Sequence, residues 1–408
     1  MTLAPRQCEL SEDLRTPMKL DYDRMQTTQS PLNAAFAALQ AGRHSEAVQL
    51  FRQAQPASPQ NITLYIGLAY AFAGLGDMRQ AEQAIDHALR LDPRNIRSLI
   101  FKGDRRAAAG ETRKAASFYD AALRSASTVP QIPQDLTADL ARIQSLTQSI
   151  MREYENEILQ RLKDQGFSRP ERSPRFQRSL DILVGKSSIY AQEPTAYYYP
   201  ELPQIEFYDR NQFDWAEAVE AHTEAIRGAL LDELNQSEDL FCAYVQGDDR
   251  PHVDPHNMVG NTDWSARFFW KDGRRQEEAL SRHSAVEQAL SHAPLCDIPG
   301  ATPSVLFSRL KPHAAIPPHN GLLNVRLICH LPLVIPGNGF LRVGSQKRSW
   351  TEGELLVFDD SIEHEAANQS DAERVILLFD IWRPELSKEE QDLIRALLSG
   401  FETLKESR

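Results

Sequence analysis

The sequence predicts a multidomain α + β protein, in which an all-α repeat array precedes a β-rich domain with flanking helices. Two observations predict this fold class. Glycines and alanines recur every 34 residues between positions 28 and 129, and a period of this length is typical of stacked helix pairs. From residue 304 onward, five short apolar runs follow one another without a helical stretch between them. Such a series indicates an antiparallel sandwich or barrel.

The helical repeats follow residues 1–28, which mix charge, Pro and Thr without periodicity and are expected to form a disordered or loosely ordered arm. Gly42, Gly76 and Gly110 are 34 residues apart, and alanines follow each glycine five and twelve positions later. In a tetratricopeptide repeat the Gly lies in the turn between two helices, and the alanines let these helices approach closely. The pattern predicts a tetratricopeptide solenoid with repeats at about 28–61, 62–95 and 96–129.

A capping helix and a linker are expected after the repeats. Apolar residues continue at helical spacing over about 135–165, which predicts a helix that covers the last repeat, so the helical domain spans 29–165. The stretch 166–179, "GFSRPERSPRFQRS", is rich in Pro and Arg. It predicts a linker over 166–189, followed by a second domain over 190–408.

The second domain is predicted to be β-rich, with one helical stretch at 214–234 and a capped helix that begins after Ser387. Each apolar run after residue 304 is bounded by Pro, Gly, Asn or Asp. Together they predict a double-stranded β-helix of the jelly-roll or cupin-like type. The runs are "SVLFSRL", "NVRLICHLPLV", "GFLRVG", "ELLVFDD" and "RVILLFDIW".

Composition excludes several functional classes. The net charge of −12 over 408 residues argues against a nucleic-acid partner, because phosphate backbones are held by clustered Lys and Arg. Four cysteines without CxxC spacing fit a reducing compartment better than a disulfide framework or a zinc site. The N-terminal residues lack a signal-peptide pattern and no apolar run is long enough to span a bilayer. We therefore expect a cytoplasmic protein without a membrane partner.

Residues 317–324, "PPHNGLLN", carry the first candidate for metal chemistry. Non-haem Fe(II) sites usually combine two histidines with one carboxylate, yet His319 is followed by Asn320 and Gly321. His364 comes 45 residues later, after a predicted strand, so a jelly roll can bring it to His319. Arg374 then opens a very apolar strand, where a guanidinium needs a buried anionic partner. A dicarboxylate such as 2-oxoglutarate is such a partner.

The sequence also contains a second His-Asp pair and several acidic residues close to His364. "RPHVDPH" holds a His-x-Asp pair, His252 and Asp254, but the positions ten residues after His292 and His313 are Thr and Leu instead of Arg, so a polar loop is expected there. Asp359, Asp360 and Glu363 precede His364. These carboxylates are expected to cap a turn, and the alternative is that one of them orients the imidazole of His364.

From about 190 to 386 the sequence resembles the aspartyl/asparaginyl β-hydroxylase family of Fe(II)/2-oxoglutarate oxygenases. The motifs that carry the resemblance are "SRLKPHAAIPPHNGLLNVRLICHLPLVIP" (308–336), "WTEGELLVFDDSIEHEAAN" (350–368), "RVILLFDIWRPEL" (374–386) and, more weakly, "DWSARFFW" (263–270). Members of this family also place a tetratricopeptide-like domain before the oxygenase domain.

The resemblance implies roles for particular residues. It implies that His319 and His364 bind iron while Gly321 stands where other oxygenases have a carboxylate. Arg374 is the third catalytic residue, and it would hold the distal carboxylate of 2-oxoglutarate. The other cosubstrate-binding residues implied are Ser308, His330, Arg326 and Trp264. The chain departs from the Arg-x-Arg-x-His pattern of animal members at Ile328, which leaves the substrate open.

The predicted function is a 2-oxoglutarate-dependent dioxygenase that uses Fe(II) and O₂ to hydroxylate Cβ of Asp or Asn in a peptide or protein. Its solenoid groove would dock that substrate, or alternatively the repeats only brace the catalytic domain or mediate self-association. Two other functions remain open: a catalytically silent scaffold, which the missing carboxylate favours, and a small-molecule or lipid hydroxylase, which Ile328 favours.

Overall fold

The computed structural model describes residues 31–167, 173–236, 240–247 and 257–399. The chain divides into two compact units, one up to Lys186 and the other from Ser187. The predicted arm, 1–28, lies outside the described residues, and so do His252 and Asp254 of the rival pair.

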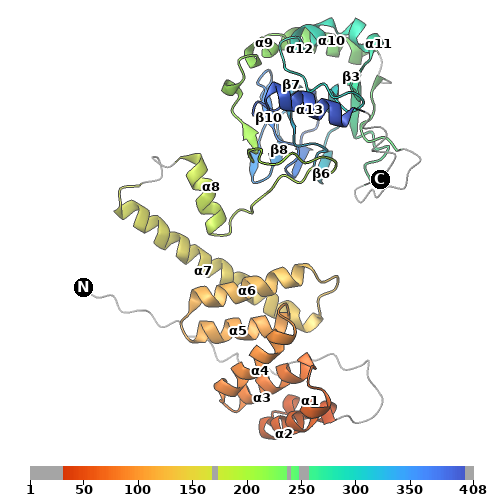
Figure 1. The fold of residues 1–408 in the computed structure, drawn as a ribbon. Helices are drawn as coiled ribbons and strands as arrows, with labels where there is room; N and C mark the ends of the chain where they lie inside the picture. Colours follow the sequence, from red (N-terminus) through yellow and green to blue (C-terminus); the bar gives the residue numbers. More distant parts are fainter. Residues whose placement is uncertain (1–30, 168–172, 237–239, 248–256, 400–408) are drawn as a thin grey trace. The chain divides into compact units, whose positions relative to one another are not determined.

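Three helix pairs begin the first unit (Figure 1). The turns within the pairs contain Gly42, Gly76 and Gly110, whose φ angles of 70°, 79° and 75° lie in the left-handed region that glycine adopts readily. All six alanines of the repeat pattern are buried where the helices cross. The predicted repeats are confirmed. The pairs are α1 (Pro31–Gln40) with α2 (His44–Ala54), α3 (Ile62–Gly74) with α4 (Met78–Leu91), and α5 (Ile96–Ala108) with α6 (Thr112–Ser127).

Two further helices complete this unit. The predicted capping helix is α7 (Thr137–Asp164), and the chain leaves it at Gly166 with a φ of 87°. The segment predicted as a linker contains α8 (Pro174–Leu183). Ser173 caps this helix and Pro174 occupies its first turn, where the missing proline N–H costs nothing. Short 3-10 turns at Gln55–Ala57 and Gln134–Leu136 lie between the longer helices.

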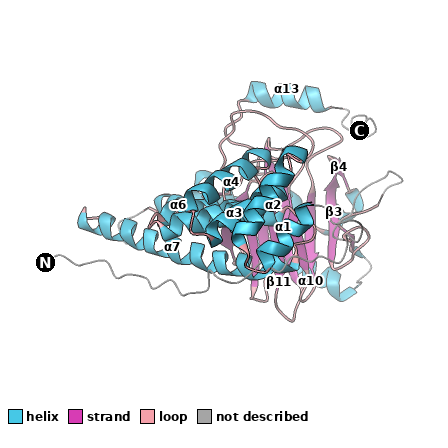
Figure 2. Ribbon diagram, turned by 90° about the horizontal axis from the view of Figure 1, so that it is seen from below, coloured by secondary structure: helices cyan, strands magenta, loops and turns pink. Residues whose placement is uncertain are grey.

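The second unit contains two antiparallel sheets, drawn in magenta in Figure 2. The larger sheet has the strand order β1-β10-β7-β12-β5-β3-β2, and β4 pairs with β3. The strands of the described residues do not close into one barrel. Those of the larger sheet are β1 (Phe207–Tyr208), β2 (Cys242–Ala243), β3 (Trp264–Lys271), β4 (Arg274–Arg275), β5 (Val305–Leu310), β7 (Arg326–Val334), β10 (Leu356–Phe358) and β12 (Arg374–Trp382).

The smaller sheet has the order β6-β11-β8-β9. Its strands are β6 (Ala315–His319), β8 (Gly339–Val343), β9 (Gln346–Arg348) and β11 (His364–Asn368). Apolar side chains of both sheets form one buried cluster, to which the larger sheet contributes Ile328 and Phe358 and the smaller sheet Ile316 and Leu341. The two sheets therefore face each other across a shared core.

Helices cover the other face of the larger sheet (Figure 1). The predicted helical stretch 214–234 is interrupted, so it forms two helices instead of one. These helices and the two that follow β4 bury their apolar residues against the sheet. They are α9 (Ala216–Glu220), α10 (Thr223–Gln236), α11 (Glu277–Arg282) and α12 (Ser284–Leu290), with a short 3-10 turn at Arg210–Gln212 before them. The last helix, α13 (Lys388–Leu398), has the predicted capping box between Ser387 and Glu390.

All five predicted strands after residue 304 are present, as β5, β7, β8, β10 and β12. The sequence pattern missed β6, β9 and β11. β6 contains Pro317 and Pro318 and lies at the edge of the smaller sheet, where proline is tolerated because no neighbouring strand needs its N–H. Within the described residues, no helix is long and apolar enough to cross a membrane.

Candidate active site

A cavity of about 300 Å³ lies between the facing sheets. β3, β5, β7, β10 and β12 line it from the larger sheet, and β6, β8 and β11 line it from the smaller one. Residues from eight strands therefore meet in one space. All the site residues predicted from the sequence line this cavity, namely Trp264, Ser308, His319, Arg326, His330, His364 and Arg374.

His319 and His364 are direct cross-strand neighbours. His319 ends β6, His364 begins β11, and the two residues are paired in the antiparallel register. Opposed residues of antiparallel strands hold their side chains about 5 Å apart. The two imidazole rings accordingly lie with their centroids 4.1 Å apart.

Backbone carbonyls set the orientation of both rings. The Nδ1 of His319 lies 2.8 Å from the carbonyl oxygen of Pro317, and the Nδ1 of His364 lies 3.1 Å from that of Ile362. Because a carbonyl only accepts, each Nδ1 carries the proton and each Nε2 carries the lone pair that a metal ion would take. Burial, together with the neighbouring His319, lowers the pKa of His364 to about 3. His364 is therefore a neutral imidazole at neutral pH.

The carboxylate of Asp360 fills the space beside Gly321. A Cβ atom at position 321 would overlap the Asp360 side chain, so only glycine fits at this position. The Gly321 N–H donates to the backbone carbonyl of Asp360 at 2.7 Å, which fixes the two segments together. Burial raises the pKa of Asp360 to about 6, although Arg326 acts in the opposite direction. The Oδ1 atom of Asp360 is buried and has no hydrogen-bond partner among the described residues.

Arg326 is held by two buried carboxylates. Its guanidinium donates to the Oδ2 of Asp360 at 3.0 Å and to the Oδ2 of Asp380. The pairing raises the pKa of Arg326 further above its ordinary value, even though burial opposes its charge. The guanidinium predicted to face cosubstrate or substrate is thus already neutralised by this chain.

Arg374 has the opposite environment. Only 2% of the residue is exposed, and its guanidinium donates to the backbone oxygen of Ser308 at 3.2 Å and, more weakly, to the Ser308 hydroxyl at 3.5 Å. No carboxylate of the described residues pairs with it, and its Nε atom has no partner there. Burial lowers the pKa of Arg374 to about 9. A buried cation in this condition is costly unless an anion enters the cavity.

His330 lies beside Arg374 and is also neutral. Burial and the nearby guanidinium hold the pKa of His330 well below its ordinary value. The indole N–H of Trp350 donates to the Nδ1 of His330 at 3.3 Å, so the proton of the neutral ring lies on Nε2. The Arg374 guanidinium also lies over the Trp350 ring, 4.9 Å from the ring centroid. Trp350 therefore touches both groups that could bind an anion.

Trp264 lies on β3 of the same sheet, and β5 separates it from the strand of Arg374. Its indole N–H donates to the Ser308 hydroxyl at 3.1 Å, and its ring stacks on Tyr244 at a centroid distance of 3.9 Å. Since the Ser308 hydroxyl accepts from Trp264, its own proton can be directed toward an anion beside Arg374.

Asp360 and Trp350 are the site residues whose contacts the sequence did not reveal. Asp360 was expected to cap a turn, with one of the acidic neighbours of His364 as a possible partner of the imidazole. Its contact with Gly321 joins positions 39 residues apart, and no local pattern encodes that distance. Trp350 begins one of the motifs, but its contacts with His330 and Arg374 depend on the packing of three chain segments.

Among the described residues, no group of three or more His, Cys, Asp or Glu side chains is arranged to hold a metal ion.

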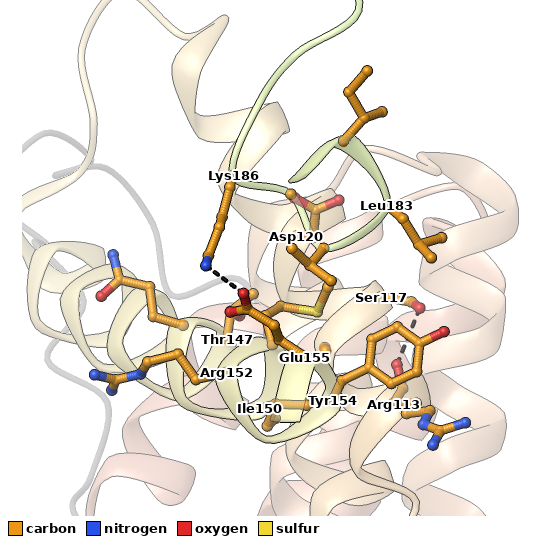
Figure 3. Close-up of a pocket in the computed structure, with 16 residues that line it drawn as sticks. Arg113, Ser117, Asp120, Thr147, Ile150, Arg152, Tyr154, Glu155, Leu183 and Lys186 are labelled. Atoms are coloured by element: carbon orange, nitrogen blue, oxygen red, sulfur yellow. Dashed lines mark hydrogen bonds and ion pairs between the residues drawn. The ribbon is translucent and has the colours of Figure 1, made fainter. Parts of the chain in front are cut away.

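A second cavity, of about 680 Å³, lies within the helical unit between α6, α7 and the end of α8 (Figure 3). Its lining combines the apolar Ile150 and Leu183 with charged side chains, of which Lys186 donates to Glu155 at 2.5 Å.

Two family models match the chain. The model described as "Aspartyl/Asparaginyl beta-hydroxylase" matches residues 220–384, and these residues include the His pair, Arg374 and the cavity walls. Residues 220–384 are thus similar to the aspartyl/asparaginyl β-hydroxylase family. A tetratricopeptide-repeat model matches residues 38–100 of the helical unit.

Known relatives match about half of the chain. The human aspartyl/asparaginyl beta-hydroxylase is 30% identical over 182 residues, which cover 44% of this chain and 22% of that protein. The ornithine lipid ester-linked acyl 2-hydroxylase of Rhizobium tropici is 31% identical over 189 residues, which cover 46% of this chain and 63% of that protein. The chain thus spans less than two thirds of the length of these relatives.

Among solved structures, the Yersinia enterocolitica type III secretion translocator chaperone SycD is similar to the helical part of the chain. It is 18% identical, with a TM-score of 0.28, and the match covers 31% of this chain and 83% of the chaperone chain.

Proposed function

We propose that this chain is an Fe(II)- and 2-oxoglutarate-dependent dioxygenase that hydroxylates a C–H bond. The observation that carries the proposal is Arg374, a buried cation without an anionic partner among the described residues, at the wall of the cavity that contains the His pair. A silent scaffold would gain nothing from such a residue, because an unpaired buried charge lowers the stability of the fold.

The two histidines fit iron. His319 and His364 would hold Fe(II) through their Nε2 atoms, since both rings have Nδ1 directed at a backbone carbonyl. Asp360 would stand beside the metal instead of a residue at 321, because its carboxylate fills the space next to Gly321. When bound, iron and 2-oxoglutarate together activate O₂, and the cosubstrate is converted to succinate and CO₂.

The polar groups near Arg374 fit a dicarboxylate. Arg374 and the Ser308 hydroxyl would bind the distal carboxylate, by the paired hydrogen bonds that guanidinium groups make. The Nε2 proton of His330 would donate to the other carboxylate, and Trp264 would orient Ser308. The predicted role of Arg326 is changed in this proposal: it would hold Asp360 in place instead of contacting the cosubstrate.

The resemblance favours Cβ of Asp or Asn in a peptide or protein as the target of hydroxylation, and docking of that substrate by the helical unit belongs to the same proposal. The second cavity offers a place for such a partner (Figure 3). A second candidate is the hydroxylation of a lipid acyl chain, which the match to the Rhizobium tropici acyl 2-hydroxylase favours. The facing antiparallel sheets support the predicted jelly-roll class.

The test is cosubstrate binding and turnover by purified protein. Wild type is expected to bind Fe(II) and to convert 2-oxoglutarate slowly to succinate without added substrate. Arg374→Met is expected to weaken 2-oxoglutarate binding at least a hundredfold, since a buried charge pair loses about 3 kcal/mol or more when one partner is removed. His319→Ala is expected to lose iron.

Arg309→Met serves as the matched control. Arg309 is a buried arginine of the neighbouring strand β5, but it contacts Ser265, Phe241 and Glu373 instead of the cavity. Its replacement should leave the affinity for 2-oxoglutarate unchanged. If wild type binds neither iron nor 2-oxoglutarate, the proposal is wrong and the scaffold function stands.

A further inference from the structure

The two loops next to the His pair are held together by a segment from earlier in the chain. Residues 320–325 follow His319, and residues 359–363 precede His364. Residues 192–203 pair with both of these loops. This segment lies outside the residues that the family model matches. Its contacts therefore concern the geometry of the His pair in this particular chain.

Backbone hydrogen bonds connect the 192–203 segment to both loops. Four N–H groups of the segment donate to carbonyl oxygens of the loops, at 2.8, 2.9, 3.0 and 3.0 Å. One of them reaches the loop before His364, and the other three reach the loop after His319. The bonds run from Glu193 to Ser361, from Thr195 to Gly321, and from Ala196 and Tyr197 to Leu322.

The Gln192 side chain bridges the two loops directly. Its Nε2 donates to the Oδ2 of Asp359 at 2.7 Å, and its Oε1 accepts from the Nδ2 of Asn324 at 3.0 Å. Asp359 belongs to the loop before His364, and Asn324 belongs to the loop after His319. Gln192 is 7% exposed, and the other two residues are fully buried. The bridge is therefore made of side chains that are shielded from water.

Asp359 accepts hydrogen bonds at both of its carboxylate oxygens. Its Oδ1 accepts from the N–H and the hydroxyl of Ser361 at 3.0 and 2.5 Å, and its Oδ2 accepts from Gln192 and, at 2.9 Å, from Arg383. A buried acceptor that loses its donor costs about 1–3 kcal/mol, so these bonds hold the loop in one conformation. Asp360 is the next residue, and its side chain extends from this fixed loop toward Gly321.

The residues assigned to the distal carboxylate of 2-oxoglutarate are separate from this network. Ser308 and Arg374 lie on β5 and β12 of the larger sheet, whereas the His pair lies on β6 and β11 of the smaller one. Within the described residues, neither the Ser308 nor the Arg374 side chain is hydrogen-bonded to the 192–203 segment. A change in the segment should therefore act on the two histidines and leave the distal end of the cosubstrate in place.

We propose that residues 192–203, through Gln192 and the backbone bonds beside it, position His319 and His364 for metal binding. This inference rests on the proposed function. Gln192 does not line the cavity, so it is a positioning residue that acts through the two loops. Coupling between sites is reciprocal, so a segment that favours the metal-binding arrangement of the loops must itself be stabilised when the metal binds.

The first experiment uses the wild-type full chain, with Co²⁺ alone as the probe in place of Fe(II). Amide hydrogen exchange is followed by mass spectrometry with and without saturating Co²⁺. The amides of residues 193–197 should exchange more slowly by about fivefold or more when Co²⁺ is bound, which is the low end of the usual coupling between two sites. The amides of α10, on the outer face of the larger sheet, should be unaffected and serve as the internal control.

The second experiment uses Gln192→Met, which keeps the length of the side chain but removes both of its hydrogen-bonding ends. The affinity for Co²⁺ should fall about tenfold, the lower end of the effect of residues that orient metal ligands. The absorption spectrum of bound Co²⁺, which reports the ligand geometry, should change. At saturating Fe(II), KM for 2-oxoglutarate should be unchanged, because Ser308 and Arg374 keep their positions.

Two further variants complete the series. Thr195→Pro removes the N–H that donates to Gly321, and because Thr195 is exposed the variant should fold and should also weaken Co²⁺ binding. Thr223→Val is the matched control for the loss of a buried hydrogen bond. The hydroxyl of Thr223 donates to the backbone oxygen of Glu220 at 2.6 Å, on the outer face of the larger sheet. This variant should lower thermal stability but keep the Co²⁺ affinity and spectrum of wild type.

The proposal is overturned if Gln192→Met and Thr195→Pro bind Co²⁺ with the affinity and spectrum of wild type, since the segment would then only stabilise the fold. It is also overturned if Co²⁺ leaves the exchange of residues 193–197 unchanged, a measurement that decides the question even where Gln192→Met does not fold. If wild type binds metal and 2-oxoglutarate in such a case, this inference fails alone. If wild type binds neither Co²⁺ nor Fe(II), the proposed function fails with it.

Discussion

Gly321 and Asp360 show how one residue determines another across the cavity. A glycine at 321 is required by space, because Asp360 lies where a Cβ would be placed. The vacancy noted in the sequence is therefore filled by a carboxylate that comes from the segment before β11. That carboxylate is held by Arg326.

Gly321→Ala is expected to lower the free energy of unfolding by about 1–3 kcal/mol, the usual cost of overpacking a buried site, and to weaken Fe(II) binding. Gly321→Asp by itself should lower the free energy of unfolding more than Gly321→Ala does. Combined with Asp360→Gly, which empties the space, Gly321→Asp should recover much of the lost stability. Denaturant unfolding and metal titration measure both effects.

Gly228→Ala provides the control for this series. Gly228 lies within α10, and a Cβ there meets no atom within 4 Å. Its replacement by alanine should stabilise the fold by up to about 1 kcal/mol. Equal destabilisation by Gly321→Ala and by the double variant would contradict the role assigned to Asp360.

Trp350 is expected to position the two anion-binding groups. Trp350→Phe keeps an aromatic ring under Arg374 but removes the N–H that donates to His330. One hydrogen bond contributes about 1 kcal/mol, so KM for 2-oxoglutarate should rise about fivefold while kcat changes little. Trp382→Phe is the matched control, because its N–H donates to Asp297 away from the cavity. A fall in kcat with unchanged KM would argue against this role of Trp350.

The sequence allowed prediction of seven residues that line the cavity but not of their partners. Arg374 was predicted because an arginine in an apolar strand needs an anion. The His pair was predicted from its spacing and from the resemblance. Arg326 was placed correctly in the cavity, yet the two carboxylates that neutralise it come from β12 and from the segment before β11. Such contacts follow from sheet register, which a sequence pattern does not specify.

At the scale of elements, β6 explains why the His pair is so well defined. Its two prolines are unusual in a strand, but an edge strand accepts them. Pairing with β11 then sets His319 directly against His364. Long apolar strands were predictable because their patterns are strong, whereas β6 and β11 are five residues long and are stabilised by their neighbours.

The helices on the outer face of the larger sheet enclose a buried titratable pair. The Nε2 of His283, which is 1% exposed, lies 2.9 Å from the Oε2 of Glu233 on α10. Arg267 on β3 lies 3.6 Å from the other oxygen of Glu233. Burial lowers the pKa of His283, although Glu233 acts to raise it.

The folded state should therefore lose stability as the pH falls below about 6.5, the ordinary pKa of histidine. His283 stays neutral in the folded protein in that range, while the unfolded chain binds a proton there. His283→Gln can still donate to Glu233 but does not titrate, so this part of the pH dependence should disappear. Denaturant unfolding at pH 7 and pH 5.5 measures it.

His313→Gln is the control for His283→Gln. His313 is 66% exposed and pairs with Asp371 at the surface, so the variant should keep the pH dependence of wild type. If His283→Gln kept the pH dependence of wild-type stability, the loss of stability at low pH would arise from other groups.

For the whole molecule, the division at residues 186 and 187 predicts that each unit is stable by itself. Residues 187–408 contain every predicted site residue and both sheets. Expressed alone, they should bind Fe(II) and 2-oxoglutarate within about twofold of the full chain. Calorimetry of the full chain should show two unfolding transitions. Loss of cosubstrate binding in the isolated unit would show that the helical unit is required for the site.

The order of an all-α repeat array and a β-rich domain was predictable because each rests on a pattern that repeats along the sequence. The 34-residue period and the series of apolar strands each occur several times, so the failure of one position does not hide them. The helix in the predicted linker, α8, was missed because its prolines and arginines resemble a linker. Its first turn does carry the Ser-Pro start that helices use.

The strand order of the larger sheet also has a consequence for how the protein is made. β12 is paired with both β5 and β7 near the middle of the sheet, but it is the last strand to be synthesised. The two halves of the sheet therefore have open edges until residue 382 has left the ribosome, whereas the helical repeats are built from local contacts that form quickly. Since β12 begins with Arg374, the cavity acquires its unpaired cation only in this last step of folding.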